Sequence, residues 1–167
     1  IAFARQGRGA AGADISPVMI AKAQEHARQE GVEVLWKVAG FGELASRFDP
    51  PFDAVTCLGN SLPHLPDDTA LEGALRDFAR LLRPGGLLVV QDRNYDKVLA
   101  AAGKSVHLNA RDEPDGETLF VRMSEPRGGE VMDFSILTLR KRAGAWSADL
   151  ATTPLRAITR GVMERTL

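Results

Sequence analysis

The sequence is poor in the residues that build covalent or metal-bound structure. Its 167 residues include a single cysteine, Cys57, which excludes a disulfide within the chain. The three histidines, His26, His64 and His107, are too scattered to make a convincing set of metal ligands, so we expect no metal site. Cys57 lies in an apolar run, and this position favours a core residue over a nucleophile.

Long apolar runs and strong net charge are also missing. No stretch approaches the roughly eighteen apolar residues that cross a bilayer, and no signal peptide is visible, so we expect a cytoplasmic protein without a membrane partner. The net charge of −1 provides no excess of positive charge for binding nucleic acid. The hydrophobic content of 44% is enough for a buried core, and the length indicates one domain.

One glycine-rich motif stands in the wrong context for a dinucleotide site. Residues 7–12, GRGAAG, match G-x-G-x-x-G, but that fingerprint must follow a strand and open a helix. Here a helical stretch at 1–6 precedes the motif and a predicted strand at 10–15 follows it. Gly7 fits a helix C-cap instead, and a nicotinamide oxidoreductase is the least favoured enzyme class.

Apolar runs alternate with amphipathic stretches through the first hundred residues. The predicted strands cover 10–15, 32–38, 54–58 and 87–90, and the predicted helices cover 17–30, 67–83 and 97–102. Ser16 and Pro17 supply the start signals of the first helix. The tight turn at 84–86, PGG, joins the second helix to the last of these strands. This alternation predicts an α/β fold with a doubly wound, mostly parallel sheet.

The pattern changes toward the C-terminus. Three predicted strands, at 117–123, 131–141 and 146–153, are joined by turn-forming stretches at 125–129 and 142–145, which indicates antiparallel hairpins. Residues 155–158 continue the last strand, and Thr159 caps a short final helix. We expect a single domain over 1–167, with an α/β part at 1–105 and an antiparallel β part at 106–160.

Distinctive side chains follow the predicted parallel strands, where such sheets bind ligands. Asp14 can accept hydrogen bonds from two ribose hydroxyls, or it can simply stabilise the start of the next helix. Phe41 can cover a flat ligand ring or pack in the core. Residues 59–61, Gly-Asn-Ser, with His64 form either the floor of a site or an ordinary connecting loop. Residues 91–95, QDRNY, follow the next strand.

These segments resemble a known family. Residues 14–19, DISPVM, and 81–89, LLRPGGLLV, look like the acidic motif and the hairpin of class I S-adenosylmethionine-dependent methyltransferases. Residues 57–65, CLGNSLPHL, and 92–96, DRNYD, look like two segments of glycine N-methyltransferases. The resemblance runs over most of 1–160 and implies a Rossmann-like class I methyltransferase fold, truncated at both ends, with the antiparallel layer on the substrate side.

The resemblance implies a binding site for S-adenosyl-L-methionine, with S-adenosyl-L-homocysteine as the product. Within it Asp14 would bind the ribose, and Met19 and Phe41 would flank the adenine. The family's glycine-rich loop, which meets the methionine end, is expected upstream of Ile1. The full set of cofactor-binding residues implied for this sequence is Asp14, Ile15, Met19, Gly40, Phe41, Leu58, Gly59, Ser61 and His64.

The resemblance also implies how an acceptor is held. Asn60 and Arg93 would hold the carboxylate of a small amino acid, glycine or sarcosine, and Tyr95 would support Arg93 or the wall of the site. The planar fork of arginine matches a carboxylate, although a surface ion pair is the alternative for Arg93. Methylation of another small acceptor and a non-catalytic cofactor-binding or oligomerising role stay open. Exposed sheet edges would favour a homo-oligomer.

Overall fold

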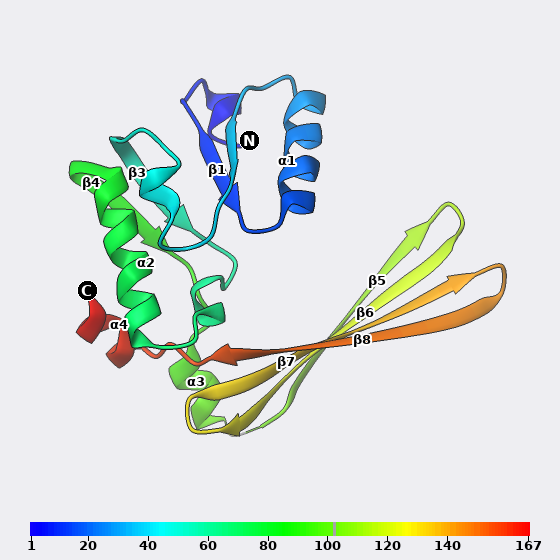
Figure 1. Ribbon diagram of the computed structural model, residues 1–167. Helices are drawn as coiled ribbons and strands as arrows, with labels where there is room; N and C mark the ends of the chain where they lie inside the picture. The colour runs from blue at the N-terminus through cyan, green and yellow to red at the C-terminus, as the bar shows by residue number, and fades with distance from the viewer. Residues whose placement is uncertain (102) are drawn as a thin grey trace. The chain divides into compact units, whose positions relative to one another are not determined.

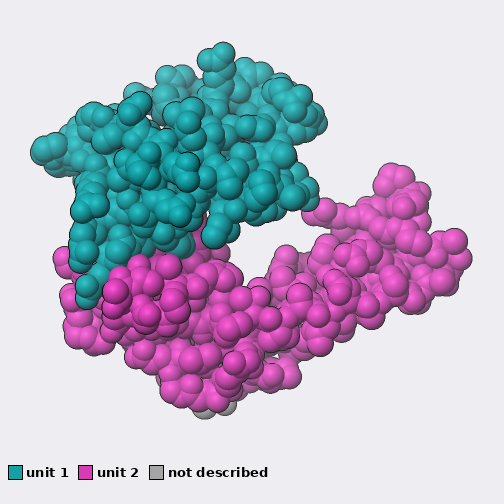
Figure 2. Space-filling view, in the orientation of Figure 1, with its two compact units in different colours: residues 1–56, 72–89 teal, residues 57–71, 90–167 magenta. Residues whose placement is uncertain are grey.

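The computed structural model describes residues 1–101 and 103–167. The chain forms two compact units, one of residues 1–56 and 72–89 and one of residues 57–71 and 90–167 (Figure 2). Strands alternate with helices in the first part of the chain, and a four-stranded antiparallel sheet follows (Figure 1). The predicted fold class is therefore confirmed. Ala102, the last residue of the helix expected at 97–102, lies outside the described residues.

The first unit begins with a parallel β-α-β arrangement. Strand β1 (Ala11–Asp14) pairs with β2 (Leu35–Val38), and α1 (Pro17–Gln29) connects them beside the sheet (Figure 1). Ser16 is the N-cap of α1, because its hydroxyl accepts a hydrogen bond from the Met19 amide at 3.3 Å. The predicted start of this helix is confirmed.

The end of α1 explains why β2 is shorter than the strand predicted at 32–38. Gly31 adopts a left-handed φ of 66°, and the Val32 amide donates to the Ala27 carbonyl at 3.0 Å. This closure satisfies a free carbonyl of the last helical turn. The chain after Gly31 is therefore still part of the helix cap, and strand pairing starts only at Leu35.

Strands β3 (Phe52–Cys57) and β4 (Leu82–Val90) form a second pair, connected by α2 (Asp68–Leu81). The Arg83 Nε lies 2.6 Å from Asp53 Oδ1 near their starts, and the Gln91 amide donates to the Cys57 carbonyl at 2.9 Å at their ends. The two strands thus run in the same direction. Helix α2 buries the apolar face that its sequence predicts, formed by Leu71, Ala74, Leu75, Phe78 and Leu81.

The turn expected at 84–86 is wrong as a separate element. Strand β4 begins at Leu82, directly after α2, and includes the Pro-Gly-Gly stretch. The Gly86 backbone lies so close to β3 that an added Cβ would stand 3.2 Å from the Asp53 carbonyl oxygen. Gly85 has a left-handed φ of 74° within this strand, a conformation that glycine adopts without a steric penalty.

The second unit contains four antiparallel strands where the sequence predicted three. The sheet has the order β5 (Ser105–Glu113), β6 (Gly116–Gly128), β7 (Val131–Arg142) and β8 (Ala145–Arg156). Strand β5 escaped prediction because its sequence, SVHLNARDE, is mostly polar and its side chains are mostly exposed. It exists because it pairs with β6 along its whole length.

Two short helices flank this sheet in the chain. Helix α3 (Tyr95–Ala100) is capped by the Asn94 side chain, and α4 (Arg160–Thr166) is capped by Thr159 as predicted. A small core joins α3 to the sheet and is formed by Tyr95, Met132, Leu155 and Ala157. Within the part of the chain that the structure describes, no helix is both long and apolar enough to span a membrane.

Candidate functional site

The carboxyl ends of β1 and β2 bring together two of the predicted cofactor-binding residues, Asp14 and Gly40. The Ala39 amide donates to the Asp14 carbonyl at 3.1 Å, which places Gly40 beside the end of β1. Asp14 Oδ1 accepts a hydrogen bond from the Ser16 amide at 2.8 Å, so one oxygen supports the start of α1. The other makes no hydrogen bond to any residue that the structure describes, and it can accept one from a ligand.

Apolar side chains are exposed at the same strand ends. Ile15 is 76% exposed and Met19 is 51% exposed. Ile15 Cδ1 would lie 3.4 Å from a Cβ added at Gly40, so the Ile15 side chain lies beside Gly40 at ordinary contact distance. Exposed apolar atoms beside an open carboxylate oxygen fit a ligand with an aromatic ring and hydroxyl groups.

The loop after β2 is anchored to α2. The Phe41 ring packs edge-on against Phe78, with ring centroids 5.8 Å apart. Asp77, which is 4% exposed, accepts hydrogen bonds from the amides of Leu44 at 2.7 Å and Ala45 at 2.9 Å. These two amides open the short 3₁₀ helix Leu44–Ser46. Asp77 was not predicted from the sequence; the available signal was a carboxylate directly before Phe78 on the apolar side of a helix.

The loop after β3 carries the next group of predicted cofactor-binding residues. Gly59 and Asn60 are both left-handed, with φ of 83° and 68°. Gln91 fixes them, because its side-chain Oε1 accepts from the Gly59 amide at 2.9 Å and its carbonyl accepts from the Asn60 amide at 3.1 Å. Leu58 is 53% exposed, and the Ser61 hydroxyl donates to the Leu58 carbonyl at 3.1 Å. His64 is exposed at the end of the 3₁₀ helix Leu62–His64.

The structure also brings the three predicted catalytic residues together. Asn60 Oδ1 accepts a hydrogen bond from the Arg93 amide at 3.0 Å, and Asn60 Nδ2 donates to the Tyr95 hydroxyl at 2.9 Å. Burial raises the pKa of the Tyr95 hydroxyl, while the hydrogen bond with Asn60 and the charge of Arg93 act against this rise. Arg93 Nη1 donates to the hydroxyl of Ser124 in β6 at 2.7 Å, a partner that the sequence did not reveal.

Two further groups at the ends of β3 and β4 are buried. Burial, with a smaller contribution from Asp92, raises the pKa of the Cys57 thiol to about 11, although the Leu62 amide opposes the rise. The thiol is therefore protonated at neutral pH and poorly suited to act as a nucleophile. Both carboxylate oxygens of Asp92 lack a hydrogen-bond partner among the described residues, and burial raises the pKa of this carboxyl group. Such unpartnered groups concentrate at functional sites.

Arg93 and Ser124 lie at one end of an open groove in the second unit. The groove has a volume of about 560 Å³ and is lined by polar residues of β5 and β6, by Phe134 of β7 and by two apolar residues of β5. Its polar lining includes Arg93, His107, Asn109, Arg122 and Ser124. The lining contains donors and positive charge but no carboxylate, so it is suited to an anionic ligand.

Residues 1–86, more than half of the chain, match a family model described as a methyltransferase domain. The chain belongs to the methyltransferase domain family. The match includes the ends of β1, β2 and β3, and it confirms the class I S-adenosylmethionine-dependent methyltransferase resemblance of the sequence.

The curated relatives of this methyltransferase domain differ in their acceptors. Glycine N-methyltransferase of Rattus norvegicus is 37% identical over 93 residues, which is 51% of this chain and 32% of the relative. The ubiquinone biosynthesis O-methyltransferase of Xylella fastidiosa (strain 9a5c) is 36% identical over 100 residues, which is 60% of this chain and 38% of the relative. The matched part of the chain thus spans about a third of the length of these relatives.

Solved structures share the methyltransferase fold over nearly the whole chain. An S-adenosylmethionine-dependent methyltransferase from Clostridium acetobutylicum ATCC 824 superposes with a TM-score of 0.78 at 16% identity and covers 96% of this chain and 62% of that chain. The sugar N-methyltransferase KedS8 from Streptoalloteichus sp ATCC 53650 gives a TM-score of 0.73 at 25% identity, with 94% of this chain and 60% of that chain covered. In both superpositions the aligned part of this chain includes the antiparallel sheet.

Proposed function

We propose that the protein transfers a methyl group from S-adenosylmethionine to the amine of a small amino acid such as glycine or sarcosine. The observation that carries this acceptor class is the set of hydrogen bonds around Arg93. Its backbone is held by Asn60 at 3.0 Å, and its guanidinium group is turned onto Ser124 at 2.7 Å. A fixed guanidinium with further free N–H groups is a suitable partner for a carboxylate.

The residues at the strand ends fit the cofactor. The open oxygen of Asp14 would accept a hydrogen bond from the ribose, and the exposed side chains of Ile15 and Met19 would cover the adenine together with Phe41. Gly40 leaves room beside Ile15. The loop of Leu58, Gly59, Ser61 and His64 would meet the remaining parts of the cofactor. The bound cofactor supplies an activated methyl group, so the protein itself needs mainly to position the acceptor.

The acceptor nitrogen also has a candidate partner. An amino acid arrives as a zwitterion, and its carboxylate would bind Arg93 while its ammonium group has to be held and deprotonated. Asp92 precedes Arg93 directly and has a carboxylate without a partner among the described residues. Burial raises the pKa of the Asp92 carboxyl, which makes its carboxylate a better proton acceptor. Such a base would serve an amine or a hydroxyl acceptor, so the choice of an amino acid rests on Arg93.

A second candidate is methyl transfer to a different small acceptor in the cytoplasm with the same cofactor-binding residues. The similarity to a ubiquinone biosynthesis O-methyltransferase and to a sugar N-methyltransferase supports this second candidate. The two candidates differ at Arg93. A carboxylate-bearing acceptor depends on its guanidinium fork, whereas a phenol or a sugar amine without an anionic group does not.

The first test is calorimetric titration with S-adenosylhomocysteine, followed by transfer of a labelled methyl group to glycine and sarcosine. Arg93→Lys should raise the KM for glycine by about tenfold or more, because a lysine cannot form the bidentate contact. Arg111→Lys, an exposed arginine of β5, is the matched control. An unchanged KM in Arg93→Lys would exclude the amino-acid acceptor. Binding of S-adenosylhomocysteine without turnover would favour a non-catalytic cofactor-binding role, with oligomerisation checked by sedimentation.

A further inference from the structure

The polar residues of β5 and β6 that line the groove beside Arg93 share one face of the antiparallel sheet. His107 and Arg122 are directly paired across β5 and β6, and Ser124 is two residues from Arg122 on the same strand. Side chains two residues apart share a face and stand about 7 Å apart along a strand. The Arg122 side chain therefore starts about 7 Å from Ser124, on the face where Ser124 contacts Arg93.

Arg122 forms no ion pair with a carboxylate of the described residues. It is exposed, and it makes no ion pair or side-chain hydrogen bond with any residue that the structure describes. On this face of the sheet the carboxylates are Glu113, which pairs with Arg142, and Asp149. Asp149 belongs to β8, two strands from Arg122 and thus about 10 Å away across the sheet. The groove therefore holds two separate cationic positions, Arg93 and Arg122.

We propose that the groove takes a methyl acceptor with a second anionic group, which Arg122 and His107 bind while Arg93 and Ser124 bind the first. This inference rests on the proposed function and shifts its acceptor from glycine and sarcosine, which carry one carboxylate, to an amino acid with a second anionic group. The groove is open and reaches from Arg93 to Arg122, so its lining extends past the carboxylate of a bound amino acid. A carboxylate or a phosphate supplies the required chemistry, since either accepts charge-assisted hydrogen bonds from arginine. Asn109, one row further along β5, offers an amide to the same group.

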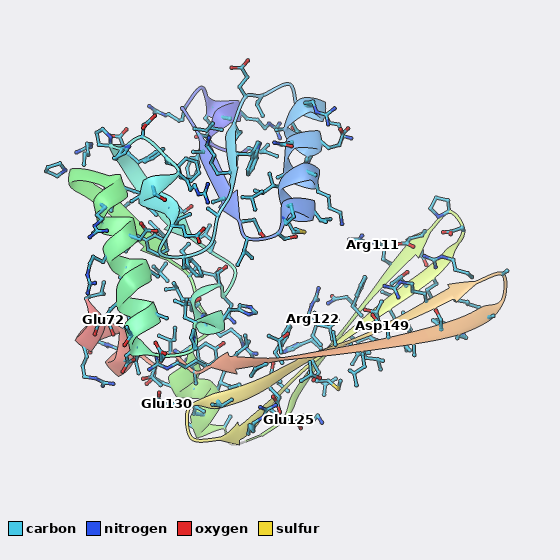
Figure 3. All side chains as sticks on the ribbon, viewed as in Figure 1. Glu72, Arg111, Arg122, Glu125, Glu130 and Asp149 are labelled. Atoms are coloured by element: carbon cyan, nitrogen blue, oxygen red, sulfur yellow. The ribbon has the colours of Figure 1, made fainter. Side chains whose placement is uncertain are left out.

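The test compares three probes by amide chemical-shift titration of the 167-residue chain, with and without saturating S-adenosylhomocysteine. The probes are glycine, L-aspartate and O-phospho-L-serine, and the variant is Arg122→Gln. Arg111→Gln is the matched control, because Arg111 shares the face of His107 but lies nearer the tip of the β5–β6 hairpin and does not line the groove (Figure 3). A higher affinity for phosphoserine than for aspartate would indicate a phosphate.

We expect the unsubstituted chain to bind a dianionic probe about tenfold more tightly than glycine, because a charge-assisted hydrogen bond is added. Arg122→Gln should abolish this preference without changing the affinity for glycine, and Arg111→Gln should preserve it. The inference is overturned by equal affinity for the three probes, by no binding of any probe, or by an equal loss in both variants. Failure of S-adenosylhomocysteine to bind, with the preference intact, would instead remove the proposed function and leave an anion site.

Discussion

Asp77 Oδ2 accepts a hydrogen bond from the Leu44 amide at 2.7 Å, across 33 positions of sequence. The other carboxylate oxygen accepts from the Ala45 amide at 2.9 Å, so one buried side chain caps the 3₁₀ helix after the Gly40–Phe41 turn. The neighbouring Phe78 packs against Phe41. Helix α2 thereby fixes the loop that we assign to the adenine of the cofactor.

Asp77→Asn should lower the free energy of unfolding by about 1–3 kcal/mol, because an NH₂ group would face a backbone N–H. It should also weaken binding of S-adenosylhomocysteine, since the Gly40–Phe41 turn loses its anchor. Urea unfolding and calorimetric titration measure the two effects. Glu72→Gln is the control on the exposed side of the same helix (Figure 3), and it should change stability by less than about 0.5 kcal/mol. Equal effects of both substitutions would contradict the anchoring role.

Asn60→Ala should lower both stability and acceptor affinity. The substitution removes the acceptor of the Arg93 amide and the partner of the Tyr95 hydroxyl. It also puts alanine at φ 68°, a left-handed conformation that asparagine tolerates better because of its short polar side chain. We expect a loss of about 2–4 kcal/mol of stability in urea unfolding. Tyr95→Phe removes only the hydroxyl and should cost about 1–2 kcal/mol. An equal loss of unfolding free energy in the two variants would show that the hydrogen bond to the Arg93 amide does not contribute to stability.

Cys57 predicts a loss of stability at high pH. Burial raises the pKa of the thiol from 9.0 to about 11 in the folded protein, so above pH 9 the unfolded chain releases this proton while the folded chain retains it. Stability contributed by this thiol is present below pH 9 and is lost as the pH rises toward 11, by up to about 2 kcal/mol. Thermal unfolding between pH 8 and pH 11 tests this. Cys57→Ala should be less stable at every pH but should lack this part of the slope.

Arg156 should stabilise the second unit more than the exposed arginines do. Its side chain is 12% exposed, and its Nη2 contacts the carboxylates of Asp68 and Glu130. Arg156→Met would remove a largely buried cation from its two exposed carboxylate partners, at a cost of about 1–2 kcal/mol. Arg160→Met is the control, because Arg160 is 83% exposed in its pair with Glu164 and should contribute less than about 0.5 kcal/mol. Chemical unfolding of both variants in low and in high salt measures the two losses of unfolding free energy, since salt screens the exposed pair more strongly.

Local sequence signals were sufficient for the elements with strong caps and regular periodicity. Ser16 with Pro17, the apolar face of α2, and Thr159 before α4 each specify a helix through interactions within one or two turns. The hairpin turn at Ala143–Gly144 has two positive φ values, of which the sequence favours only that of Gly144, because a Cβ makes a positive φ unfavourable for alanine. Such features need few distant contacts, so the sequence alone determined them, together with the order of α/β units and the methyltransferase family.

The tertiary structure decided what depends on distant partners. The polar strand β5 exists because β6 supplies its backbone hydrogen bonds, and the Gly86 backbone passes close to β3 within a strand that already begins at Leu82. Composition cannot reveal either, since pairing partners are set by the path of the chain. The same holds at the site. The sequence indicated Asn60, Arg93 and Tyr95 as a group, but only folding could show that Asn60 is the hub of their hydrogen bonds, that Ser124 orients Arg93, and that Asp77 anchors the loop after β2, because these contacts join residues more than thirty positions apart.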